Sequence, residues 1–137
     1  MGGYKFYWVG CKKGLAGVGV MVAQNWVYKV VDVLRVSEKM MVLRLSVGKT
    51  VVNIVSIYAS EAGRLPEEKE EFYICLNRVL SGIKELETVF IAGDFNGHVG
   101  ELVEGFEGVH GGKGYGDRNF ESKLLLEFCR IKMIDNR

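Results

Sequence analysis

The sequence is poor in cysteine, proline and histidine, the residues that mark several common protein classes. Its 137 residues include one proline and two histidines, and the three cysteines are far apart with no CxxC pair. This pattern argues against a disulfide framework and a zinc site, and it suits a reducing compartment. We expect two of the cysteines, Cys75 and Cys129, to pack on the apolar faces of helices.

Long apolar runs and targeting signals are also missing. No run approaches the roughly 18 apolar residues of a membrane span, and Phe6 stands where a myristoylation signal requires Ser or Thr. Lys12 and Lys13 interrupt the first apolar stretch, so no secretory signal is expected. We therefore expect an intracellular protein, nuclear or cytoplasmic, with no membrane partner.

The charges are unevenly distributed although the formal net charge is only +1. Residues 1–58 carry 8 basic against 2 acidic residues (+6), residues 59–107 carry 4 against 11 (−7), and residues 108–137 carry 6 against 4 (+2). A basic leading segment can meet a polyanion, and it can equally be the solvated face of a strand.

The first half of the chain has the pattern of β-strands. Apolar or alternating runs predict strands over residues 4–9, 17–23, 27–36, 40–47 and 50–58. Gly48 is the first of two residues between the last two runs, which predicts a type II′ hairpin and antiparallel pairing.

The second half changes period. Pro66 suits the first position of a helix, and Phe72, Leu76, Val79, Leu80 and Ile83 form a stripe at helical spacing. The all-apolar run at 89–92 predicts a strand covered on both faces, and a glycine-rich loop over 97–118 follows. Asn119 is a plausible cap for a last helix, whose expected apolar stripe is Phe120, Leu124, Leu125, Phe128 and Ile131.

These elements predict an α/β (α+β) protein with a mixed sheet and packed helices. A further strand would normally return to the sheet after the last helix, so we expect residues 1–137 to be a single partial domain, a piece of a larger one. Strands meant for the centre of a sheet would then have bare edges, which favour aggregation.

Two nucleotide-site patterns fail on spacing. VGKT at 47–50 lacks the glycine that a P-loop has five positions before Gly48, and GGKGYG at 111–116 does not fit GxGxxG.

The stretch GDFNGH, residues 93–98, is the strongest candidate for chemistry. It follows an apolar strand, and ligands gather outside the carboxyl ends of strands in such sheets. Asp94 can hold a hard cation or accept a proton from water, and Asn96 can orient that water or donate to a phosphoryl oxygen. The alternative is an Asx-type turn whose polar groups satisfy the nearby backbone.

The order SIYAS (56–60), helix, VFIAGDFN resembles the central part of the endonuclease/exonuclease/phosphatase superfamily, which has a DNase-I-like fold. Tyr58, Asp94 and Asn96 match the family's Tyr and Gly-Asp-x-Asn motifs, and Ser60 stands where proline is usual. GVHGGKGYGDRN and LLLEFCRIKMIDN are further similar to LINE-type retrotransposon endonuclease domains and to craniofacial development protein 2-like sequences. The usual glycine after the Arg-Asn pair is replaced by Ser122 or Lys123.

The resemblance implies a partial four-layer α/β sandwich and a Mg²⁺- or Mn²⁺-dependent hydrolase that nicks DNA. It implies that Asp94 activates or orients water and touches the metal, that Asn96 holds the phosphate or the water, and that Tyr58 hydrogen-bonds the phosphate. No small-molecule cofactor is implied, and the oligomeric state stays open.

Other polar residues are weaker candidates. His98 does not match the family's Ser-Asp-His motif, and is either a loop residue or a phosphate contact. Arg118 can touch phosphate, Asn119 matches a family position but also suffices as a helix cap, and His110 is expected to be a loop residue.

Departures from the family limit the expected activity. The main metal-binding Glu and the Ser-Asp-His segment have no match in the 137 residues. Since catalytic groups act as a unit, we expect weak or no activity from this chain alone. The rival hypotheses are a non-catalytic retroelement remnant that at most binds nucleic acid or a partner, and a phosphatase of the same fold.

Overall fold

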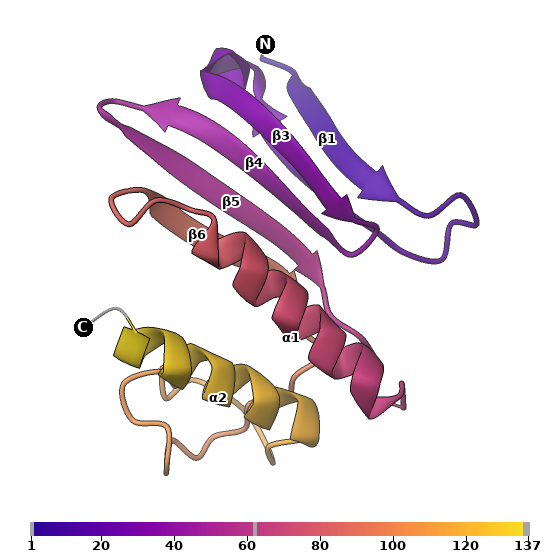
Figure 1. Ribbon diagram of the computed structural model, residues 1–137, viewed down its shortest axis with the longest axis vertical. Helices are drawn as coiled ribbons and strands as arrows, with labels where there is room; N and C mark the ends of the chain where they lie inside the picture. Colours follow the sequence, from indigo (N-terminus) through magenta and orange to yellow (C-terminus); the bar gives the residue numbers. More distant parts are fainter. Residues whose placement is uncertain (1, 62, 136–137) are drawn as a thin grey trace. The chain divides into compact units, whose positions relative to one another are not determined.

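The computed structural model describes residues 2–61 and 63–135. The elements, in chain order, are β1 (Tyr4–Gly10), β2 (Gly17–Ala23), the 3-10 helix η1 (Gln24–Lys29), β3 (Val30–Ser37), β4 (Met40–Val47), β5 (Thr50–Tyr58), α1 (Pro66–Ser81), β6 (Thr88–Asp94) and α2 (Phe120–Asp135). Strands dominate the first half and helices the second (Figure 1). The expected α/β class is therefore confirmed.

The strands form two sheets. One consists of the antiparallel pair β1–β2, and the other is a mixed sheet in the order β3-β4-β5-β6. The β4–β5 hairpin pairs Val47 with Thr50 around a turn in which Gly48 has φ 60°. Lys49 keeps a negative φ, as the predicted type II′ turn requires.

The chain divides into two compact units. The first comprises Met1–Ala59 and Ile74–Gly93, and the second comprises Ser60–Tyr73 and Asp94–Arg137. The boundaries fall after Ala59, inside α1, and before Asp94, the last residue of β6.

The core of the first unit lies between its two sheets. Val22, Leu43 and Leu45 are buried there, with half-buried residues packed around them, among them Tyr7, Val20, Val33 and Ile54. On the other face of β4, Met40 and Val42 are also buried, because β4 lies between two neighbouring strands and is covered on both faces.

Three details of the prediction are wrong, and the first concerns the start of β3. Residues 27–29 belong to η1, and the strand begins at Val30. Val27 packs against the core from this short helix, so the connection between the sheets overrides the β-propensity of these residues.

The second correction concerns residues 89–92, which form β6 but are not covered on both faces. Val89 and Phe90 are 36% and 59% exposed, and Ile91 is half-buried. β6 is the last strand in the sheet order, so it has the position of an edge strand among the described residues.

The third correction concerns the buried face of α2. Phe120 and Ile131 are 59% and 56% exposed, whereas Glu121, Ser122 and Leu126 are buried. Glu121 pairs with Lys69 at 2.7 Å, and the Ser122 hydroxyl donates to the Asn119 carbonyl at 2.8 Å. Because polar residues with partners occupy part of the buried face, apolar spacing alone predicts a rotated stripe.

Candidate functional site

The candidate site begins where β6 ends. Gly93 has φ 148°, and a Cβ atom added to it would lie 1.9 Å from the carbonyl oxygen of Ile57 on β5. Only glycine fits this close backbone approach. Gly93 thus fixes the path of the chain at the end of β6, next to Asp94.

Asp94 and Asn96 form a tight turn in the second unit. Asp94 Oδ1 accepts a hydrogen bond from the backbone N–H of Asn96 at 2.8 Å. Asn96 has φ 50° and is the only non-glycine residue with positive φ in the part of the chain that the structure describes. The Asx-type geometry is therefore present, and the Asp94 side chain is exposed.

Asn119 ties this turn to the start of α2. Its Oδ1 accepts from the Ser122 N–H at 3.0 Å, as a helix cap does, and also from the His98 N–H at 2.9 Å. Its Nδ2 donates to the Asn96 carbonyl at 3.4 Å, and its backbone N–H donates to the His98 carbonyl at 3.0 Å. The predicted cap is confirmed, and the same side chain also holds two residues of the GDFNGH stretch.

The two histidines differ in environment. His98 has an exposed side chain, while its backbone is fixed on both sides by Asn119. His110 is buried: its Nδ1 accepts from the Gly112 N–H at 2.9 Å, and its Nε2 lies 3.2 Å from the Gly100 carbonyl. Nδ1 accepts, so Nε2 carries the proton, and His110 is the structural loop residue predicted.

Arg118 braces the glycine-rich loop. Its Nε donates to the Val99 carbonyl at 3.3 Å, and its Nη2 donates to that of Leu102. The guanidinium lies 4.7 Å from the ring centroid of buried Phe106, which Arg130 also approaches at 5.4 Å. Two of its donors are thus used within the loop, and its contact with phosphate stays a prediction.

Tyr58 belongs to the first unit. It is the last residue of β5, is half-buried, and its backbone N–H donates to the Lys39 carbonyl at 2.9 Å. The structure therefore connects Asp94, Asn96, His98 and Asn119 in the second unit. The membership of Tyr58 in the same site stays a prediction.

Asp94 is the residue of the candidate site whose side chain suits a divalent cation. Among the described residues no group of three acidic, histidine or cysteine side chains could hold a metal ion. Mg²⁺ at phosphate-transfer sites is held by one or two carboxylates, substrate phosphates and waters. The exposed Asp94 carboxylate fits one place in such a set.

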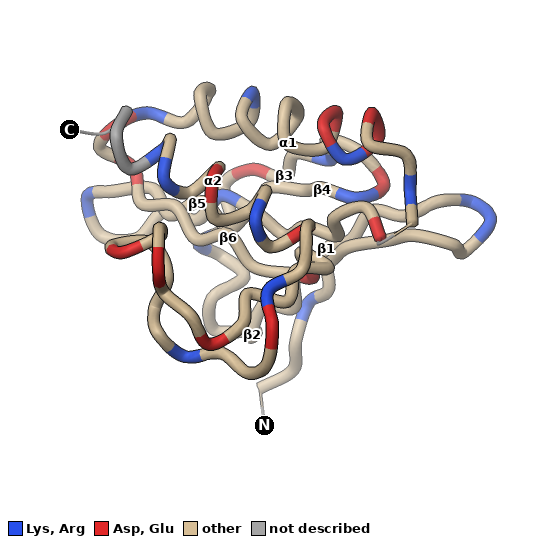
Figure 2. The backbone as a smooth tube through the Cα atoms, turned by 90° about the horizontal axis from the view of Figure 1, so that it is seen from below, with Lys and Arg blue, Asp and Glu red and all other residues tan. Residues whose placement is uncertain are grey.

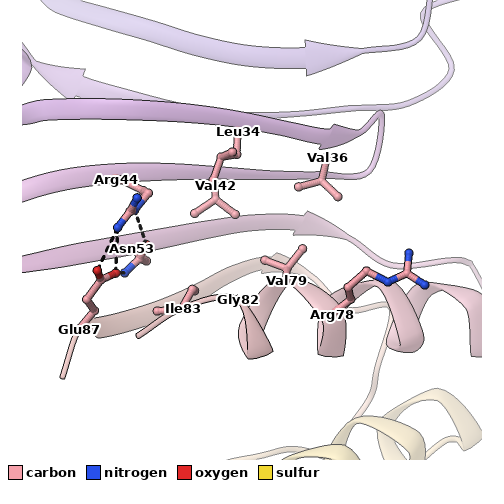
Figure 3. Close-up of a pocket in the computed structure, with 10 residues that line it drawn as sticks. All are labelled: Leu34, Val36, Val42, Arg44, Asn53, Arg78, Val79, Gly82, Ile83 and Glu87. Carbon is pink, nitrogen blue, oxygen red and sulfur yellow. Dashed lines mark hydrogen bonds and ion pairs between the residues drawn. The ribbon is translucent and has the colours of Figure 1, made fainter. Parts of the chain in front are cut away.

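A buried polar network in the first unit was missed by the sequence analysis. Asn53 is fully buried on β5; its Oδ1 accepts from Arg44 Nε at 3.2 Å, and its Nδ2 donates to Glu87 at 2.8 Å. Arg44 also contacts Glu87 at 2.9 and 3.1 Å (Figure 3). These hydrogen bonds, with Asn53 first and Arg44 after it, lower the pKa of Glu87. The available signal was an Arg and an Asn among the mostly apolar residues of β4 and β5.

This network borders a cavity of about 250 Å³ (Figure 3). Arg78 of α1 and apolar residues of β3, β4, α1 and the segment after α1 line the rest of it, including Leu34, Val42, Val79 and Ile83. All polar partners in the network are satisfied, so its role is to join β4, β5 and the segment before β6.

Among the described helices none combines the length and apolar character needed to cross a membrane.

Comparisons with known proteins add no family to this geometry. No protein-family model matches the chain, and a search of curated proteins gave no match.

Proposed function

We propose that the chain carries part of the active site of a metal-dependent phosphodiesterase of the retrotransposon endonuclease type, within a DNase-I-like sandwich. The substrate of such a site is DNA, cleaved in one strand by hydrolysis, and the chain alone is expected to have weak or no activity. The GDFN turn, with Asp94 exposed at the end of a strand, supports this proposal.

Each site residue has a role in this reaction. Asp94 presents an exposed carboxylate oxygen that orients the attacking water or contacts the ion. When bound, Mg²⁺ or Mn²⁺ stabilises the charge that develops on phosphoryl oxygens, an effect of several kcal/mol. Asn96 positions the water or donates to the phosphate, and the Tyr58 hydroxyl donates to another phosphate oxygen.

The observation that carries the proposal is the backbone of Asn96. A non-glycine residue with φ 50° is uncommon and costs free energy, and such residues gather at functional sites. Here Asp94 Oδ1 and Asn119 Nδ2 hold the strained residue from two sides. A turn held in this way keeps the Asp94 carboxylate in one position, which catalysis by positioning requires.

A second candidate is a non-catalytic remnant that at most binds nucleic acid or a partner. The observation that favours it is that Asp94 Oδ1 and the Asn119 side chain already satisfy neighbouring backbone groups. In that case the turn is structural, and neither residue interacts with a metal ion.

Metal-dependent DNA binding separates the two candidates. Affinity for a fluorescein-labelled duplex is measured by anisotropy with Mg²⁺ and with EDTA. Mg²⁺ ordinarily weakens protein–DNA contacts by competing for phosphates, so tighter binding with Mg²⁺ indicates an ion shared by protein and DNA. We expect Mg²⁺ to tighten binding by the natural chain and to weaken binding by Asp94→Asn.

The matched control is Asp117→Asn, which removes the same charge from an exposed position of the same unit. It is expected to keep the response to Mg²⁺. An equal response of Asp94→Asn and the natural chain would reject the proposed site.

A further inference from the structure

The first thirty-one residues have an unusual combination of side chains. They include four lysines, Lys5, Lys12, Lys13 and Lys29, and no acidic residue. In Figure 2, where acidic residues are red, β1 and β2 therefore have no red position. The same segment contains both tryptophans of the chain.

Three aromatic side chains line one face of β1. Tyr4, Phe6 and Trp8 alternate along the strand, so they share a face, and they are 69%, 59% and 59% exposed. We call these three residues the aromatic face. Tyr7, on the opposite face of β1, packs against the core instead.

The partner strand covers this face only in part. Across β1–β2, Tyr4 pairs with Ala23 and Trp8 with Gly19, and Phe6 pairs with Met21, which is itself 64% exposed. A Cβ atom on Gly19 would come within 2.5 Å of the Phe6 ring, so glycine allows that ring to lie close to the sheet. The rings thus lie on a thin two-stranded platform, and the core of the first unit does not use them.

Cations lie beside aromatic residues in this part of the first unit. η1 is tied to the start of β1, because the Gln24 N–H donates to the Gly3 carbonyl at 2.8 Å. In η1 the Lys29 ammonium lies 5.3 Å from the Trp26 ring and 5.2 Å from the Tyr28 ring. Arg35 Nε donates to the Trp8 carbonyl at 3.0 Å.

We propose that the aromatic face, with Lys12 and Lys13 in the turn after β1 and Lys29 in η1, binds single-stranded nucleic acid. Lys5 lies on the opposite face of β1, where its ammonium is 5.2 Å from the Tyr7 ring. Alternate residues of a strand are about 6.7 Å apart, so each ring can take a different base. Stacking of bases on aromatic rings beside a basic surface is how single strands are bound without sequence preference. This function is separate from DNA cleavage at Asp94.

The charge is what selects this ligand over an apolar protein surface. An apolar partner needs no cations, whereas Lys12, Lys13 and Lys29 flank β1 in the sequence and complement a phosphate backbone. Duplex DNA has the same phosphates, but its bases are stacked on one another and offer no free face. The site therefore prefers single strands.

Intrinsic fluorescence tests this with the full 137-residue chain, because both tryptophans lie in the segment concerned. An oligothymidylate of about 12 nucleotides suits such a site, and an oligouridylate of equal length compares RNA with DNA. We expect both to quench tryptophan emission, and heparin, a polyanion without bases, to leave it unchanged. Equal quenching by heparin, or none by either oligonucleotide, overturns the proposal.

Substitutions then assign the ligand to the aromatic face, with affinities measured by anisotropy of a labelled oligonucleotide. Tyr4→Leu and Trp8→Leu keep apolar volume but remove the ring, and each is expected to weaken binding about tenfold. Tyr115→Leu is the matched control, since Tyr115 is 86% exposed in the other unit. Tyr4 is the first residue of β1, so Tyr4→Leu can be read even if Trp8→Leu fails to fold. A loss below threefold for Tyr4→Leu would count against the proposal.

Salt dependence and metal removal complete the test. Contacts from Lys12, Lys13 and Lys29 predict a slope of about −2 for log affinity against log salt, and Lys12→Gln with Lys13→Gln should reduce its magnitude by about 1.4. EDTA should leave oligonucleotide binding unchanged, which separates this inference from the metal-dependent cleavage site. If sedimentation shows that a second copy covers the aromatic face and excludes the oligonucleotide, the inference is wrong.

Discussion

Single glycines in this chain differ greatly in what they permit. Gly93 has φ 148° and no room for a Cβ atom, which would lie 1.9 Å from the Ile57 carbonyl oxygen, whereas Gly48 has φ 60° with open space around it. We expect Gly93→Ala to lower the free energy of unfolding by about 3 kcal/mol, and Gly48→Ala by about 1–2 kcal/mol. Urea unfolding of both variants measures this, and equal losses would show that the backbone at Gly93 can move aside.

Asn119 caps α2 and also hydrogen-bonds Asn96 and His98. Asn119→Ala removes the acceptor of the Ser122 and His98 N–H groups and the donor to the Asn96 carbonyl. We expect a loss of about 1–2 kcal/mol in the free energy of unfolding and faster amide exchange at His98. Asn119→Asp keeps the acceptor but not the donor, so its free energy of unfolding should lie between those of the natural chain and Asn119→Ala. A loss as large as that of Asn119→Ala would mean that the donor provides most of the stabilisation.

At the scale of single residues, part of the candidate site could be predicted from the sequence. The cap at Asn119 and the Asx-type turn at Asp94 follow from local preferences, so they were predictable. The bonds from Asn119 to Asn96 and His98 join residues 23 and 21 positions apart, and no local preference encodes them. The left-handed backbone of Asn96 was also missed.

At the scale of elements, strand and helix positions followed from periodicity, while burial did not. The hairpin at Gly48 and the helix start at Pro66 were correct because turn and cap chemistry is local. β6 was expected to be buried on the strength of its apolar residues, yet its place at the end of the sheet order leaves Phe90 exposed. Periodicity gives the spacing of a face, and tertiary neighbours decide which face is covered.

The network of Arg44, Asn53 and Glu87 makes stability depend on pH. Its hydrogen bonds lower the pKa of Glu87 from the usual 4.5, so the folded state favours the charged carboxylate. The resulting stabilisation is complete above pH 4.5 and is lost as the pH falls below 4.5 through the lowered folded-state pKa. We expect the natural chain to lose more stability than Glu87→Gln between pH 7 and pH 3.5, measured by urea unfolding.

Glu85→Gln is the control for that comparison, since Glu85 is exposed two residues away in the same segment. It should keep the acid sensitivity of the natural chain. If Glu87→Gln keeps it too, other carboxylates cause the acid sensitivity, for example Glu121, whose pKa is lowered chiefly by the hydrogen bond from Lys69.

At the scale of the whole chain, the 137 residues contain only some of the catalytic groups that the proposed reaction needs. No residue of the 137 matches the metal-binding Glu or the Ser-Asp-His motif that the resemblance implies, and catalytic groups that act as a unit lose nearly all rate together. We therefore expect the chain alone, with Mg²⁺ and in excess over supercoiled plasmid, to form open circles no faster than buffer does. Asp94→Ala purified in the same way reports any contaminating nuclease. Nicking that requires Mg²⁺ and disappears in Asp94→Ala would contradict this expectation, and it would mean that Asp94, Asn96 and Tyr58 suffice for hydrolysis without the missing groups.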